Sequence, residues 1–133
     1  MRILRPNLRK FWKDDQGNAT IEAIIWIPIF VTILAIMVNF SLILFTQTQM
    51  LKVTQNANRS YSTGSLMTIA ALESYVTTEL AHISDMSVNV AESGGIITTT
   101  VSAPFTSLAP LKIPGVSLVG RDVVVASQHY VEY

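Results

Sequence analysis

The sequence predicts an α+β fold, in which a long N-terminal transmembrane helix continues into a helical region that packs against a small antiparallel β-sheet. Three patterns predict it. Residues 23–51 contain no charged side chain. Apolar residues then recur at helical spacing as far as residue 83. From residue 86 onward apolar and polar residues alternate, and a Gly-Gly pair separates two alternating runs, which is typical of a β-hairpin.

The composition indicates a membrane-embedded or deeply buried segment. Of 133 residues, 50% are hydrophobic and only 14% are charged, and the mean hydropathy is +0.42. Soluble domains have about a quarter of their residues charged. Nine Lys and Arg balance nine Asp and Glu, which argues against a nucleic-acid partner bound through a basic surface. The absence of cysteine excludes disulfides and thiolate metal sites.

The apolar segment Ala23–Phe45 has the length of a membrane span. Its only polar residues are Thr32, Asn39 and Ser41. As a helix it would rise about 34 Å, enough to cross a hydrocarbon core of about 30 Å. The core of a cleavable secretory signal is shorter, about 7–15 residues. The rest of the chain is too small and too polar to bury such a helix, so we predict that it crosses a membrane.

The basic residues predict the orientation of this helix. Residues 1–13 contain five Lys or Arg and no acid, whereas only Lys52 and Arg59 follow the span closely. The side with more Lys and Arg is usually cytoplasmic. We therefore expect a single-pass protein with a cytoplasmic N-terminus. In a bacterium with two membranes it would lie in the inner membrane with its C-terminus in the periplasm.

Beyond the span, residues 46–83 predict helix. Met50, Leu51, Val53 and Ala57 would form one apolar face, with Gln47, Gln49, Lys52, Gln55 and Asn58 on the polar face. The Ser62–Ser65 cluster predicts a break. A second apolar stripe follows, with Ser65 as its expected N-cap. The members of this stripe are Leu66, Met67, Ile69, Ala70, Leu72, Tyr75, Val76, Leu80 and Ile83.

The last fifty residues predict a small antiparallel sheet. Met86, Val88 and Val90 alternate with polar or small residues, and Gly94-Gly95 turns the chain into a second alternating run. Three prolines between residues 104 and 114 predict a long irregular crossing. Residues 116–119 and 122–131 then predict one or two further strands, which complete an α+β head.

Glu22 and Pro28 lie in the first part of the predicted span, and each has a simple explanation. An acid in the first turn is favoured by the helix dipole. A proline in a transmembrane helix is a tolerated kink, although it leaves the Ile24 carbonyl without its helical donor. The residues that precede Glu22 give Glu22 and Pro28 a second interpretation.

The order of basic leader, Gly17, Asn18-Ala19-Thr20-Ile21-Glu22 and apolar helix resembles a prepilin leader of the type IV filament class. The spacing of six from Glu22 to Pro28 is similar to that in TadE-like proteins of tight-adherence (Tad) pilus systems. The 56–60 and 101–111 segments also resemble that family. The resemblance implies that a membrane peptidase cuts after Gly17. Asn18 becomes the new N-terminus, and Glu22 becomes the fifth mature residue.

The resemblance implies three regions and a role in assembly. These are a cytoplasmic prepilin-type leader (1–17), a transmembrane helix (18–45) and a periplasmic α+β head (46–133). The protein would be a minor pilin or pseudopilin, with the inner membrane, other minor and major pilins, the prepilin peptidase and the pilus assembly platform as partners. Glu22 would pair with the Asn18 amine and set the register between subunits. The alternative is an uncleaved single-pass anchor with a periplasmic sensor or adaptor head.

The sequence predicts no enzyme. His82 and Asp85 lie three residues apart and His129 lies in a predicted strand, but one His–Asp pair without a third ligand makes a weak metal signal. No serine lies in a G-x-S-x-G motif, and the glycines form no phosphate-binding loop. We expect no catalytic residue, metal or cofactor. Asn58-Arg59-Ser60 also fits a glycosylation sequon, a pattern common by chance.

Overall fold

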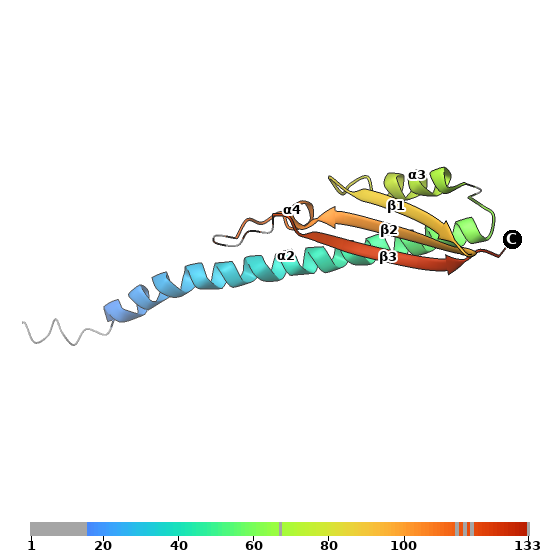
Figure 1. Cartoon of the computed structure of the whole chain (residues 1–133). Coiled ribbons are helices and arrows are strands. Elements are labelled where there is room, and N and C mark those ends of the chain that lie inside the picture. The colour runs from blue at the N-terminus through green and yellow to red at the C-terminus, as the bar shows by residue number, and fades with distance from the viewer. Residues whose placement is uncertain (1–15, 67, 114, 116, 118, 133) are drawn as a thin grey trace, which may run out of the picture. The chain divides into compact units, whose positions relative to one another are not determined.

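The computed structural model describes residues 16–66, 68–113, 115, 117 and 119–132. The basic leader up to residue 15 lies outside the described residues. The elements in chain order are α2 (Gln16–Ser62), α3 (Ile69–Glu79), β1 (Ser87–Ser93), β2 (Ile96–Pro104), α4 (Phe105–Leu108) and β3 (Asp122–Tyr130) (Figure 1). A long apolar helix and a three-stranded antiparallel sheet confirm the predicted α+β class. The chain divides into two compact units, one ending at Ala35 and one beginning at Ile36.

The first unit, where described, is the N-terminal part of α2. The side chains from Thr20 to Val31 are all exposed. The helix continues through Pro28. Apolar residues surround its axis on every side, which is typical of a helix whose environment is lipid or other helices.

The second unit contains the rest of α2, which is covered along one stripe. The packed residues follow one another at intervals of three or four, as helix packing requires. They are Asn39, Ile43, Thr46, Met50, Thr54, Ala57 and Tyr61. The predicted apolar face is correct for Met50 and Ala57, but Leu51 is exposed and Asn58 is fully buried. Asn58 is buried because its amide is satisfied by the sheet, which apolar periodicity does not reveal.

The break after α2 lies where the Ser62–Ser65 cluster predicted it. Gly64 adopts a φ of 77°, a left-handed conformation that glycine takes without strain. The next helix, α3, begins later than predicted, and its N-cap is Thr68 rather than Ser65. The Thr68 hydroxyl accepts a hydrogen bond from the Ala71 backbone N–H at 3.1 Å. The apolar stripe predicted for this helix is correct for Leu72 and Val76, which are buried.

The sheet has the order β1-β2-β3, and both pairs are antiparallel. Gly94 and Gly95 form the predicted two-residue turn, and both have positive φ, as a type I′ hairpin turn requires. The third strand is β3, whereas Ser117 and Val119 in the predicted 116–119 strand lie outside any strand.

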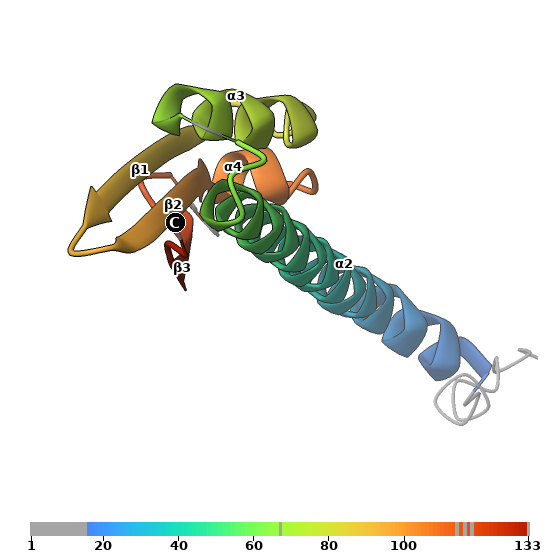
Figure 2. The same ribbon diagram turned by 90° about the vertical axis from the view of Figure 1, so that its right-hand side faces the viewer.

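The later part of α2 and the helix α3 cover the same face of the sheet (Figure 2). On β2, Ile97, Thr99, Val101 and Ala103 alternate with less buried residues and point into the core. α3 lies along β1, and the later turns of α2 lie behind β2 and β3 (Figures 1 and 2). The opposite face is rich in Ser and Thr, including a Ser87–Ser102 hydroxyl pair at 2.7 Å. The result is a two-layer α+β head with one solvent-facing sheet surface.

Candidate functional site

The predicted processing residues lie at the start of α2. The helix begins at Gln16, so the Gly17–Asn18 peptide bond lies in its first turn. The first four N–H groups of a helix have no intrahelical acceptor, so this turn is the easiest part of the helix to unwind. Glycine lowers helix stability by about 1 kcal/mol relative to alanine. The Gly17–Asn18 peptide bond thus lies in a helical turn of low stability.

Glu22 and Pro28 share one helix but not one face of it. Six residues turn an α-helix by about 600°, so the two side chains project from different sides. The Glu22 side chain is exposed. Asn18 and Glu22 are four residues apart, a spacing that places two positions on the same helical face. The helix therefore groups Asn18 with Glu22 and separates both from Pro28.

Pro28 is accompanied by an internal hydrogen bond that the sequence reasoning missed. The Thr32 hydroxyl donates to the Pro28 carbonyl oxygen at 2.8 Å, one turn earlier in the helix. A polar side chain in an apolar helix is tolerated when its own helix satisfies it. The signal that could have found this pairing is a threonine four residues after the proline.

The N-terminal half of α2 exposes a continuous series of large apolar side chains. The large side chains that are at least 44% exposed between Ile21 and Val38 are Ile21, Ile24, Ile25, Trp26, Ile27, Ile29, Phe30, Val31, Ile33, Leu34, Ile36, Met37 and Val38. The described residues contain one helix long and apolar enough to cross a membrane, and it carries this surface. Such a surface needs lipid or other apolar helices around it.

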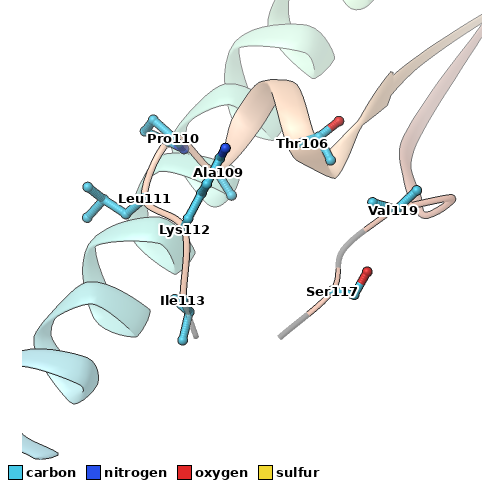
Figure 3. A pocket seen from close by; sticks show the side chains of 8 residues that line it. All are labelled: Thr106, Ala109, Pro110, Leu111, Lys112, Ile113, Ser117 and Val119. Atoms are coloured by element: carbon cyan, nitrogen blue, oxygen red, sulfur yellow. The ribbon is translucent and has the colours of Figure 1, made fainter. Parts of the chain in front are cut away.

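The head carries a shallow apolar hollow of about 420 Å³ in the crossing between α4 and β3. Pro110, Leu111 and Lys112 lie on one side of it, and Ser117 and Val119 lie on the other (Figure 3). Among the described residues, its lining offers one charged group, the Lys112 ammonium, and no acid–base pair. This chemistry is suited to contact with an apolar surface.

Asn39 joins the crossing to α2 through two hydrogen bonds, which the sequence reasoning missed. The Asn39 side-chain nitrogen donates to the Leu111 carbonyl at 2.6 Å, and the Leu111 N–H donates to the Asn39 side-chain oxygen at 3.1 Å. Asn39 is only 4% exposed. The available signal was the one asparagine in the apolar run, whose other polar residues are Thr32 and Ser41.

The candidate metal ligands do not come together. His82 and Asp85 lie beyond the end of α3, where Asp85 turns the chain with a φ of 57°. His129 lies on β3, with its Nδ1 2.9 Å from the Tyr130 carbonyl oxygen. Among the residues that the structure describes, no three His, Cys, Asp or Glu side chains are grouped so as to hold a metal ion. The Asn58 sequon is inaccessible, because Asn58 is fully buried and both ends of its amide are bonded.

Comparison with known protein families gives a match within α2. The family model described as TadE-like protein matches residues 17–59. No curated protein and no solved structure matches the chain. The matched range lies within α2 and includes Gly17, Glu22, Pro28 and the stripe that packs on the sheet. The match confirms the resemblance that these residues predict: over residues 17–59 the chain is similar to TadE-like proteins.

Proposed function

We propose that the protein is a minor pilin or pseudopilin that joins or primes assembly of a Tad-type, type IV-like pilus after removal of residues 1–17. The observation that carries this proposal is the coincidence of the TadE-like match with α2, whose apolar side chains are uncovered from Ile21 to Val38. Filament subunits of this kind need an apolar helix that is stable in lipid and can also pack against other helices. The TadE-like family is not known for an enzymatic activity.

The charge distribution supports insertion with the N-terminus in the cytoplasm of a bacterial inner membrane and the head in the periplasm. Cleavage after Gly17 removes all five cations of residues 1–13. The mature side chains then comprise four cations (Lys52, Arg59, Lys112 and Arg121) and seven acids (Glu22, Glu73, Glu79, Asp85, Glu92, Asp122 and Glu132), a balance of 4 − 7 = −3. The basic residues that hold the helix at the cytoplasmic face are lost, which eases its withdrawal from the bilayer.

The weak first turn of α2 supports Gly17 and Asn18 as the processing site. A peptidase requires an extended segment at the bond it cuts, so the turn containing this bond must unwind. The missing N–H acceptors and the glycine both lower the free energy of that unwinding.

Glu22 is proposed as the assembly residue. In an isolated subunit its exposed carboxylate reaches water at the edge of the membrane. Among packed apolar helices it must meet a cation, because an unpaired buried charge costs several kcal/mol. The amine released at Asn18 by cleavage supplies that cation, from the same chain or from a neighbour. The spacing of four places both groups on one face of the helix.

We propose Pro28 as a second assembly residue because it leaves the Ile24 carbonyl without its helical donor. This weakens the helix at one point, where it can bend to fit its neighbours. The proposed partners are other minor and major pilins, the prepilin peptidase and the assembly platform.

The direct test is the mass of the membrane-resident protein, with and without a prepilin peptidase, together with co-purification of the other pilins of the same system. A protein shortened by 17 residues that retains partner pilins supports the proposal. A full-length protein that retains a different periplasmic partner would instead establish the uncleaved anchor with a sensor or adaptor head.

A further inference from the structure

The segment Ala109–Ile113, here called the docking segment, contacts α2 within the apolar part of that helix. Its anchor Asn39 lies six residues before the end of the apolar run Ala23–Phe45. Those six residues correspond to a rise of about 9 Å. The docking segment therefore contacts the last turns of the helix portion that is apolar enough for a membrane, rather than the polar helix after it.

The neighbouring residues of α2 are exposed and apolar. Met37, Val38 and Phe40 flank Asn39 in sequence, and each is at least 47% exposed. The docking segment continues this apolar surface with Leu111, whose side chain is 43% exposed. The same environment that covers the helix at this level must therefore also meet Leu111.

Residue counting places this level near the edge of the hydrocarbon core. A core of about 30 Å takes about 20 helical residues, and 20 residues counted from Ala23 end at Leu42. Asn39 lies three residues, or about 4.5 Å, inside that limit. Irregular backbone is tolerated at such a depth only where its polar groups are satisfied within the protein.

The Asn39 amide meets this requirement for Leu111. It forms hydrogen bonds with both the carbonyl and the N–H of Leu111, two backbone groups that would otherwise need water as their partner. Lys112 follows directly and is exposed, and a lysine near a membrane edge extends its ammonium to the headgroups while its stem stays in an apolar layer. This combination of satisfied backbone, exposed leucine and adjacent lysine fits a lipid boundary.

We propose that the docking segment is a second membrane contact, in which Leu111 enters the boundary between acyl chains and headgroups, and Lys112 meets lipid phosphates. This inference rests on the proposed membrane-anchored subunit. The occupant we assign to the surface is phospholipid of the leaflet on the C-terminal side of the span. The contact would fix the height of the head above the bilayer.

The test uses the full chain in vesicles of phosphatidylcholine with a minority of phosphatidylglycerol. Because the sequence contains no cysteine, a single introduced cysteine carries a fluorophore at one position only. The labelled variants are Leu111→Cys, Met37→Cys within the span and Tyr130→Cys as an exposed control at the far end of β3. The bonds to Asn39 use the backbone of Leu111, so replacing this side chain leaves them intact.

The expected result is that a nitroxide placed high on the acyl chain quenches the label at position 111. Iodide in the water should quench it several-fold less than the label at position 130. The label at position 37 should be quenched only by lipid nitroxides. Adding Asn39→Ala should raise iodide quenching at position 111 toward the value at 130, whereas the matched change Asn56→Ala should not. Unchanged quenching in the Asn39 variant would overturn the role given to its amide.

Other outcomes separate this inference from the proposed function. Equal iodide quenching at 111 and 130, with lipid quenching at 37 retained, would overturn the second contact and leave the anchor intact. Iodide quenching at 37 would overturn the anchor itself, and the second contact with it. A label at 111 protected from both quenchers would mean that another protein chain covers the segment, which contradicts lipid as the occupant.

Discussion

Asn58 and Thr99 join the long helix to the central strand through a buried hydrogen bond, in which the Thr99 hydroxyl donates to the Asn58 side-chain oxygen at 2.5 Å. The other end of the same amide donates to the Ser127 carbonyl on β3 at 2.8 Å. Both side chains are fully buried. One asparagine thus fixes α2 against two strands, and its directional bonds define the register of helix on sheet in a way that apolar contacts alone do not.

We predict that Asn58→Ala destabilises the head by about 2–3 kcal/mol, because it leaves the buried Thr99 hydroxyl and the half-buried Ser127 carbonyl without their partner. Thermal unfolding of the full chain in detergent, followed by circular dichroism, measures the loss. Asn56→Ala is the matched control, since Asn56 is exposed on the same helix, and it should change stability by less than about 0.5 kcal/mol. Equal unfolding temperatures for the two variants would contradict the role assigned to Asn58.

We also predict that Thr99→Val loses part of its effect when Asn58 is already alanine. The valine keeps the branched shape of threonine but removes the hydroxyl that bonds Asn58. In the wild-type background we expect a cost of about 1–2 kcal/mol. A double-mutant cycle with Asn58→Ala isolates the coupling between the two side chains. Additive effects of the two changes would mean that this hydrogen bond contributes nothing measurable to stability.

Local patterns in the sequence predicted most of the fold. The uncharged run predicted α2, alternation predicted β1 and β2, and Gly94-Gly95 predicted the turn between them. The polar contacts were not predictable from the sequence, because Asn39 and Asn58 bond to backbone groups about seventy residues away. Helical periodicity shows which residues share one face of a helix, and it identifies no such distant partner. Asn58 was placed on the polar face for this reason. The candidate assembly residues, Glu22 and Pro28, were predicted from short motifs. The two hydrogen bonds between Asn39 and Leu111 could be found only in the folded chain.

Processing gives the next prediction. Gly17→Leu should block leader removal, because a bulky side chain crowds the scissile bond and strengthens the helical turn that must unwind. Immunoblots of wild type and variant, each with and without a prepilin peptidase, measure the shift of 17 residues. The wild type should shift only with the peptidase, and the variant in neither case. Identical mobility in all four lanes would show that residues 1–17 are no prepilin leader.

The imbalance of Lys and Arg across the span predicts the topology. In spheroplasts, a membrane-impermeant maleimide should label Tyr130→Cys, since Tyr130 is 72% exposed and lies in the predicted periplasmic head. The cysteine-free wild type provides the blank. In a strain without the prepilin peptidase, where the leader is retained, a cysteine introduced at Trp12 should react only after the membrane is permeabilised. The reverse pattern would overturn the orientation and, with it, the pilin proposal.

Glu22→Ala should abolish assembly while leaving cleavage and folding intact. Removing the carboxylate leaves the Asn18 amine buried and unpaired once the helices pack, at a cost of about 3 kcal/mol in the assembled state. In the isolated subunit both groups reach interfacial water, so the cost there is small. The variant should therefore be processed and abundant, but should fail to recruit partner pilins. Co-purification of those pilins with the variant is the measurement.

Two further variants separate the charge of Glu22 from its position. Glu22→Gln keeps a hydrogen-bonding group without the charge, so its recruitment of partner pilins should lie between those of wild type and Glu22→Ala. Glu79→Ala removes an exposed carboxylate at the end of α3, far along the chain from Asn18, and should recruit partners normally. If Glu22→Ala recruits partners as well as Glu79→Ala does, the glutamate is an ordinary acid at the start of a helix, favoured only by the helix dipole. A loss confined to Glu22 means that its charge acts between subunits, because that charge becomes costly only when packing excludes water from it.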